Sequence, residues 1–501
     1  MKRHVLILLA SLALAACGTS VPEDSVDVDA LPPIYPDYAD VTIPVNIAPL
    51  TFLLDDTLGQ ATDMIARYSH GNAEIVCSGK MQPAPGDWRA LTAQAVGDAI
   101  QVDVYARHGD RWQHYRPFRL FVSPDSIDPY LSYRLIPPSF VSYESLTISQ
   151  RCLEDYDESV IYDNMLCGHE ATGQCINCHS YQQYNPRRMQ FHARQSHGGT
   201  VIAYDGHLEK VNMRNDSLLS AGVYPAWHPW LPLIVYSTDL THQSFHTTDL
   251  NKVEVFDTES DIIAYDVTRG EVTNLENDSS EFEVFPAWAP DGRTLYYCSA
   301  HFDRQDSAVS KGVEVVQRAT DLRYNIYSKT FDPAVRQFGP RQPVFIADTL
   351  GLSATLPRVS PDGRFLLFTV GSYGYFHIWH HDADLWLLDL ATGEARPLDE
   401  VNSADTESYH SWSANGRWVV FSSRRDDGNY TRPFFAHCRP DGTFDRPFEL
   451  PTADPDYHRQ LLRCYNIPEF MSGRVDISPQ TFADLLKGEG RTVKYVRQLT
   501  P

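Results

Sequence analysis

The chain has 501 residues and a formal net charge of −23, because 65 acidic residues outnumber 42 basic ones. This length predicts two or more domains, and the strong negative charge argues against nucleic acid or anionic lipid as a partner. Aromatic residues make up 12% of the chain, and 33 prolines with 28 glycines supply many turns, which favours an all-β protein.

The first sixteen residues predict an export signal. A basic start, Met1-Lys2-Arg3, precedes an apolar run from Val5 to Ala16 that is too short to cross a bilayer. The ending Leu14-Ala15-Ala16-Cys17 resembles the lipobox of bacterial lipoproteins, which implies a lipid on Cys17 that holds the protein at a membrane. Gly18 after the cysteine favours the outer membrane, on either its periplasmic or its outer side. An ordinary secretory signal is the alternative.

Residues 17–40 are rich in Pro, Asp and Val without a pattern, and they predict a tether. Residues 41–123 alternate strand-like runs with turn sequences such as Pro85-Gly86-Asp87. In the run Ala99 to Tyr105, apolar and polar residues alternate with period two, as they do in a half-buried strand. These features predict a β-sandwich that serves as a spacer or docking module.

Residues 124–200 predict an irregular linker that contains Cys175-Ile176-Asn177-Cys178-His179. This is the attachment pattern of c-type haem, in which two thiols add to the haem vinyl groups and the histidine binds the iron. Because haem c is attached outside the cytoplasm, the export signal agrees with this pattern. The sequence therefore predicts one haem c, bound covalently by Cys175 and Cys178, with His179 as the axial ligand.

A sixth ligand to the iron is expected from nearby residues. Met189 ranks first and His192 second, although a buried apolar side chain is the ordinary role of a methionine beside Phe191. After Cys17 and the two haem cysteines are set aside, six of the nine cysteines remain, which permits up to three disulfides in an oxidising compartment.

Two metal sites without haem are alternatives. Cys167, His169, Cys175 and Cys178 could bind zinc, but the adjacent histidine and the export signal disfavour it. Residues 377–384 contain three histidines and two aspartates, for which a loop with incidental histidines is the favoured interpretation.

Residues 201–450 contain a short signature that recurs four times, each time followed by a strand-like run. The copies begin at Tyr224, Phe285, Leu356 and Tyr409. A strand meander of this size cannot bury both of its faces alone, so its repetition predicts a β-propeller.

The copy Trp288-Ala289-Pro290-Asp291-Gly292 resembles the repeats of TolB-type propellers. Taken with the lipobox, the Cys-x-x-Cys-His-Ser-Tyr segment, the run Met189 to Arg194 and Gly198-Gly199-Thr200, the chain resembles a family of exported TolB-like propeller lipoproteins that carry a haem-type motif. The resemblance implies a propeller of six blades and a haem motif. It implies no substrate.

Residues 451–501 predict a C-terminal segment with one short helix. Ser478 is suited to cap this helix, Pro479 to begin it and Gly488 to end it. The strand-like run from Val493 to Leu499 is expected to pair with the first blade and close the ring.

The sequence thus predicts an exported, lipid-anchored monohaem cytochrome joined to a propeller, which acts in electron transfer or redox sensing in the periplasm or at the cell surface. A redox or scaffold protein is the expected partner of the propeller face. One alternative is a haem-free propeller that serves as a scaffold or binding lipoprotein and has a structural Cys-x-x-Cys. The other is an oxidase or peroxidase with an open distal haem face.

Overall fold

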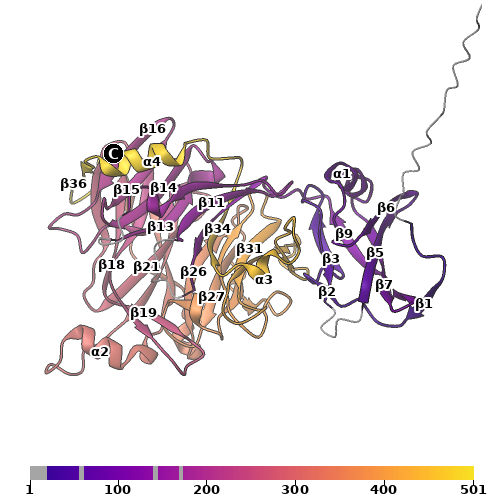
Figure 1. Ribbon diagram of the computed structural model, residues 1–501. Helices are drawn as coiled ribbons and strands as arrows, with labels where there is room; N and C mark the ends of the chain where they lie inside the picture. The colour runs from indigo at the N-terminus through magenta and orange to yellow at the C-terminus, as the bar shows by residue number, and fades with distance from the viewer. Residues whose placement is uncertain (1–19, 56–60, 139–144, 169–172) are drawn as a thin grey trace, which may run out of the picture.

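The computed structural model describes residues 20–55, 61–138, 145–168 and 173–501. A small N-terminal body lies beside a larger body of radially arranged sheets (Figure 1). Nearly all regular structure is β-strand, and the larger body has a propeller-like arrangement, as the sequence predicts. Within the described residues, no helix has the length and apolar character needed to cross a bilayer. The predicted signal and Cys17 lie outside the described residues.

The N-terminal body is one seven-stranded sheet with helix α1 (Pro85–Gln94) packed against it. Trp88 of α1 is fully buried, and its ring meets that of Tyr68 edge-on at 5.8 Å between centroids. The two-sheet sandwich is therefore not confirmed. The strands of the sheet are β1 (Ser25–Val28), β3 (Val41–Pro44), β5 (Ala61–His70), β6 (Ala73–Ser78), β7 (Ala99–His108), β8 (Arg111–Tyr115) and β9 (Phe118–Ser123), while β2 (Ile34–Tyr35) pairs with β4 (Leu53–Leu54).

Two predictions for this body were wrong. Strand β1, inside the predicted tether, pairs in parallel with β8, so that Ser25 lies opposite Trp112 and the chain joins the body from there on. Pro85-Gly86-Asp87 begins helix α1 and does not form a turn. Proline suits the first helical position because its fixed φ is helical and its missing N–H is not needed there, and Asp87 adds a favourable negative charge to the first turn.

The larger body consists of several sheets around a common centre, and in each sheet one strand is innermost and the others follow outward (Figure 1). Two of them come early in the chain: β10 (Tyr130–Ile136), β11 (Thr147–Cys152) and β12 (Glu158–Asp163), joined by β34 (Cys464–Met471); and β13 (Gln174–Tyr181), β14 (Arg188–Gln195), β15 (Gly199–Tyr204) and β16 (His207–Asn212). Two come late: β26 (Ser353–Val359), β27 (Phe365–Gly371), β28 (Asp384–Asp389) and β29 (Ala395–Pro397); and β30 (Glu407–Trp412), β31 (Trp418–Ser423), β32 (Arg432–His437) and β33 (Phe448–Glu449).

A ten-stranded sheet lies between these pairs in the chain. It contains two groups of strands that a single bridge joins, between Ser260 and Phe282. The first group is β17 (Val223–Trp227), β18 (Leu233–Phe245), β19 (Val253–Asp266) and β20 (Glu271–Glu276), and the second is β21 (Glu281–Trp288), β22 (Thr294–His301), β23 (Asn325–Asp332), β24 (Gln337–Phe338) and β25 (Gln342–Phe345). Helix α2 (Lys311–Gln317) contacts β19.

The innermost strands contact one another in the order β13, β17, β21, β26, β30 and β34, and β34 contacts β13. Strand β34 pairs with β10, with Leu131 opposite Phe470, so a strand from residues 464–471 completes a sheet that residues 130–163 begin. Residues 124–200, predicted as a linker, therefore contribute strands to two sheets. Strands β10 and β11 are buried on both faces, so their sequences lack the alternation that marks a half-exposed strand.

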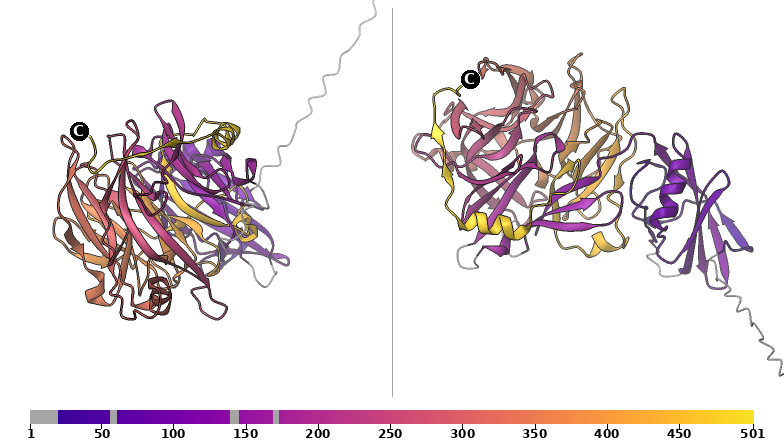
Figure 2. Two further views of the ribbon diagram at one scale, coloured as in Figure 1. Left: turned by 90° about the vertical axis from the view of Figure 1, so that its left-hand side faces the viewer. Right: turned by 90° about the horizontal axis from the view of Figure 1, so that it is seen from above.

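The C-terminal segment differs from the prediction in one respect. Helix α4 (Pro479–Lys487) begins and ends as predicted, and the Ser478 Oγ accepts a hydrogen bond from the Thr481 N–H at 3.2 Å. The run from 493 onward does not close the ring. Short strands β35 (Arg491–Thr492) and β36 (Lys494–Tyr495) instead pair with the outer edges of two neighbouring sheets, through β16 and β20 (Figure 2).

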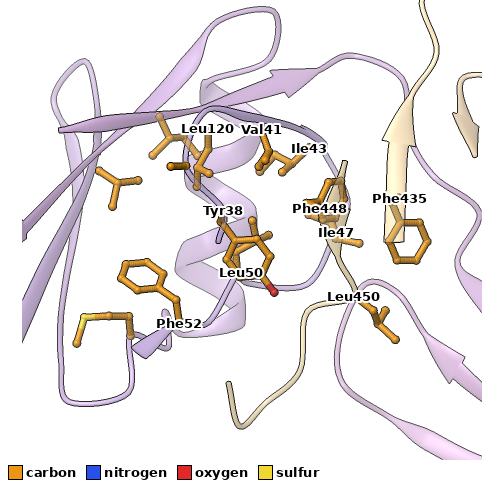
Figure 3. Close-up of a cluster of buried hydrophobic side chains, with 14 of the residues drawn as sticks. Tyr38, Val41, Ile43, Ile47, Leu50, Phe52, Leu120, Phe435, Phe448 and Leu450 are labelled. Carbon is orange, nitrogen blue, oxygen red and sulfur yellow. The ribbon is translucent and has the colours of Figure 1, made fainter. Parts of the chain in front are cut away.

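An apolar cluster joins the two bodies. Tyr38, Ile47 and Leu50 of the N-terminal body lie beside Phe448 and Leu450 of the larger body (Figure 3), and all five are at least 99% buried. Helix α3 (Tyr457–Gln460) follows this contact in the chain. The N-terminal body is therefore packed on the larger one through a shared core.

Replacement of Phe448 by Ala should lower the free energy of unfolding by about 3–5 kcal/mol, because it leaves a cavity in a fully buried cluster. Leu462→Ala is the control, since this side chain is 68% exposed, and we expect a change within about 0.5 kcal/mol. Chemical denaturation followed by tryptophan fluorescence measures both. Equal effects would contradict a shared core.

Candidate binding site in the central channel

The Cys-x-x-Cys-His sequence lies on β13, one of the innermost strands. The register between β13 and β14 breaks between Asn177 and Ser180, and Cys178 has φ +56°. An extra residue in one strand of a pair produces such a break, which is a β-bulge. The bulge sets the direction in which Cys178 and His179 point.

The same bulge recurs in the other innermost strands that the structure describes. The residues with positive φ are Cys178, Tyr224, Phe285, Leu356, Tyr409 and Ile467, and each is followed by proline or histidine. Cys178-His179-Ser180-Tyr181 thus occupies the position that Tyr409-His410-Ser411-Trp412 occupies in β30. The second half of the haem-type motif is, in structure, one copy of the propeller repeat.

The imidazole of His179 is buried. Its exposed fraction is 1%, and backbone groups of Ile467 and Ser132 lie beside the ring. Burial and the neighbouring Arg134 lower the pKa of His179 to about 3, so the ring is neutral at physiological pH. His410, at the equivalent position, has a pKa of about 3 for the same main reason, but its Nε2 is 3.1 Å from the Leu367 carbonyl oxygen.

Cavities follow the axis of the ring. A narrow space of 40 Å³, here called the waist, is lined by the six bulge residues and by His179. On one side lies the arginine cavity, of 260 Å³, which contains Arg134, Arg194 and Cys175 and shares Tyr224 and Tyr409 with the waist. On the other side lies a cavity of 320 Å³ lined by Trp227, Trp288 and Trp412.

The two cysteines of the motif lie in different cavities. Cys175 is half-buried in the arginine cavity, whereas Cys178 lies in the waist and its Sγ accepts a hydrogen bond from the Tyr224 N–H at 3.4 Å. Burial raises the pKa of the Cys178 thiol, and Arg194 opposes this in part. A strand advances about 3.3 Å per residue, so the two Cα atoms are up to about 10 Å apart, too far for a disulfide. All eight described cysteines are free.

These residues do not fit a haem attached at both thiols without a rearrangement. The donor set is suitable, since two thiols and a neutral imidazole are present, but the waist offers 40 Å³ where ligand sites offer about 300 Å³ or more. The described residues do not form the expected zinc site either, because no three of their His, Cys, Asp or Glu side chains lie close enough together to hold a metal ion. His169, one of the proposed zinc ligands, is outside those residues.

Met189 and His192, the expected distal ligands, lie on β14, one strand outward from the channel. Met189 is 99% buried in the apolar cluster that contains Ile148 and Phe191. His192 is also buried, and its Nδ1 lies 3.0 Å from the Thr200 Oγ1. Neither residue lines the waist with His179.

Arg194, which the sequence suggests only as a possible contact to haem propionates or as an exposed arginine, lines the arginine cavity. It lies on β14 directly opposite Cys175 and is half-buried. Among the residues that the structure describes, no hydrogen bond or ion pair holds its guanidinium, although Asp239 acts on it electrostatically. Arg188, six residues earlier on the same strand, shows the ordinary alternative, because it forms an ion pair with Asp205 at 2.6 Å.

Arg194 also connects the arginine cavity with a larger one. The side cavity, of 730 Å³, lies between the β13–β16 sheet and the β17–β20 strands, and Arg194, Gln195 and Thr241 line both spaces. Arg134 lines the arginine cavity as well; its Nη1 donates to the Ile176 carbonyl oxygen at 3.3 Å, while its Nε has no partner. Although the net charge of the chain is −23, two arginines with few hydrogen-bond partners, Arg134 and Arg194, line the arginine cavity.

Comparison with known proteins finds distant similarity to solved structures only. No protein-family model matches the chain, and no curated protein does. Among solved structures, an oligogalacturonate lyase in complex with manganese is 11% identical over 68% of this chain and 86% of its own, with a TM-score of 0.29. Prolyl oligopeptidase B from Galerina marginata, without ligand, is 8% identical over 64% of this chain and 44% of its own, with a TM-score of 0.37. This chain thus spans less than half of that enzyme.

In the haem-free protein, iodoacetamide should label Cys175 before Cys178, because only Cys175 lies in the wider cavity. Cys298, fully buried in β22, is the control and should label only after denaturant is added. Peptide mass spectrometry over a time course measures the order. Equal rates for Cys175 and Cys178 would contradict the different placement of the two thiols.

Proposed function

We propose that this protein is a binding protein of the cell envelope, whose six-bladed propeller takes a small anionic ligand into the arginine cavity. The ten-stranded sheet counts as two blades, since one bridge joins its halves, and the other four sheets supply the rest. A lipid on Cys17 would hold the molecule at the membrane, and the N-terminal body would set the propeller away from it.

The observation that carries the proposal is the unpartnered guanidinium of Arg194. Burial costs a half-buried arginine its hydration, and the nearby Asp239 offsets part of this cost without satisfying the N–H donors of the guanidinium. A carboxylate matches the fork of N–H donors on a guanidinium and forms two parallel hydrogen bonds with it. Arg134 in the same cavity adds a second positive charge.

The rest of the cavity wall indicates what accompanies the anionic group. Tyr224, Tyr409 and Phe376 present aromatic surface to the arginine cavity, while Gln243 supplies a polar amide. Ligand sites of proteins commonly combine such apolar walls with a few polar groups that fix orientation. We therefore expect a ligand with an apolar or peptide-like body and at least one carboxylate.

Covalent haem is the second candidate, and the neutral imidazole of His179 favours it. A neutral histidine is the form that binds iron, and Arg134 and Arg194 could meet the haem propionates. Attachment would require the waist to open. The electron-transfer, redox-sensing and oxidase interpretations depend on this candidate and fall with it.

The Arg194→Met variant tests the binding proposal without knowledge of the ligand. Removal of a guanidinium whose buried N–H donors lack partners should raise the free energy of unfolding of the ligand-free protein by about 1 kcal/mol or more. Arg188→Met on the same strand is the matched control and should not stabilise, because Arg188 has its carboxylate. Thermal denaturation measures both variants. Destabilisation by Arg194→Met would contradict an arginine that is kept for a ligand.

A stain for covalent haem decides the second candidate. The full-length protein is produced together with a cytochrome c maturation system and run on a denaturing gel stained for haem peroxidase activity. If haem is attached, the band should stain, and Cys178→Ala should abolish the stain while Cys298→Ala leaves it. We expect no stain, because Cys178 occupies a repeat position in the narrow waist. A stained band that depends on Cys178 would replace the first proposal by the second.

A further inference from the structure

Two buried carboxylates lie beside the cavities that Arg194 connects. Asp239 on β18 lines the side cavity, and both of its carboxylate oxygens are buried without a hydrogen-bond partner. Asp257 on β19 is fully buried; its Oδ1 accepts a hydrogen bond from the Tyr375 hydroxyl at 3.0 Å, and its Oδ2 has no partner. Three carboxylate oxygens are thus left unsatisfied in one place.

The two carboxylates are neighbours on adjacent strands. In the pairing of β18 with β19, Asp239 lies opposite Ser260 and Asp257 lies opposite Thr241, on either side of a bulge. The two carboxylates also affect each other's ionisation. Burial and repulsion from Asp257 raise the pKa of Asp239 well above its ordinary value. Burial raises the pKa of Asp257 to about 7. Arg194 is the cation that opposes both shifts.

Aromatic rings surround this pair. Tyr224 contacts Phe285 at 4.6 Å between centroids, Phe285 contacts Tyr375 at 5.6 Å, and Tyr375 contacts Tyr324 at 5.6 Å. The Tyr324 hydroxyl is buried and has no partner, and its nearest charges are Asp257 and Asp239. Carboxylates among aromatic faces form a site for an organic cation, because the rings attract positive charge and exclude water.

A metal ion suits this place less well than an ammonium group does. Only two carboxylates converge, and no three acidic, His or Cys side chains of the described residues could hold a metal together. A primary ammonium has three N–H donors, which match the three unsatisfied carboxylate oxygens. Its charge would take the place of the proton that the raised pKa values of Asp239 and Asp257 imply.

We propose that the ligand carries an ammonium group as well as a carboxylate, with the ammonium held at Asp239 and Asp257 and the carboxylate held at Arg194. Asp239 and Arg194 line the same side cavity, so one molecule reaches both. The 730 Å³ of this cavity exceeds what a single amino acid fills and matches a short unblocked peptide. This assignment rests on the proposed function and extends it to a class of ligand.

The test uses the full-length protein and three pools of tripeptides: unblocked, N-acetylated and C-amidated. Differential scanning fluorimetry over a concentration series gives the apparent affinity. We expect the unblocked pool to bind at least ten-fold more tightly than either blocked pool. Asp257→Asn should remove the preference over the N-acetylated pool, and Arg194→Met should remove the preference over the C-amidated pool.

Two further variants keep the result interpretable. Asp239→Asn repeats the test if Asp257→Asn does not fold. Glu283→Gln is the matched control, because Glu283 is equally buried and has a pKa raised by burial to about 9, but Arg194 is not among the charges that act on it, as it is for Asp239 and Asp257. Its preferences should equal those of the unaltered protein.

The outcomes separate the two proposals. If N-acetylated peptides bind as tightly as unblocked ones and Arg194→Met abolishes both, the ammonium assignment fails and the anion-binding function stands. If binding does not respond to Arg194→Met, the proposed function fails. If no pool binds at millimolar concentration, the peptide-like ligand is wrong.

Discussion

The pairing of β10 with β34 is the constraint on which the larger body depends. It joins residues 130–136 to residues 464–471, so the first and last parts of the ring belong to one sheet. Without this pairing β10 would present an open edge, and β34 could not complete the circle of innermost strands. The channel, its waist and the cavities on either side exist only because this circle is closed.

The bulges of the innermost strands explain both what the channel contains and why its sequence misleads. Each bulge turns one residue toward the axis, and the next residue in the chain is proline or histidine. In β13 those two residues are Cys178 and His179, which also complete a Cys-x-x-Cys-His pattern. A linear pattern records the residue types but not the strand that holds them. The same five residues therefore support a haem hypothesis in sequence and a propeller repeat in structure.

Sequence reasoning predicted those features that local chemistry dictates. The propeller-like arrangement followed from the recurring turn before a strand, and helix α4 followed from Ser478, Pro479 and Gly488. It missed the early sheets because β10 and β11 are buried on both faces and do not alternate. Sequence reasoning considered Arg194 only beside a haem, because its surroundings include residues that are distant in sequence. Asp239, which acts on it, lies on another sheet.

Ring closure by a late strand has a consequence for the order of assembly. During synthesis, β10 emerges more than 300 residues before its partner, and chains grow at about 5–20 residues per second. For that interval the early sheet lacks its innermost strand, and its exposed backbone invites pairing with other chains. The nascent molecule is thus open to aggregation until residues 464–471 have been made. A chain truncated before residue 464 would keep this open edge.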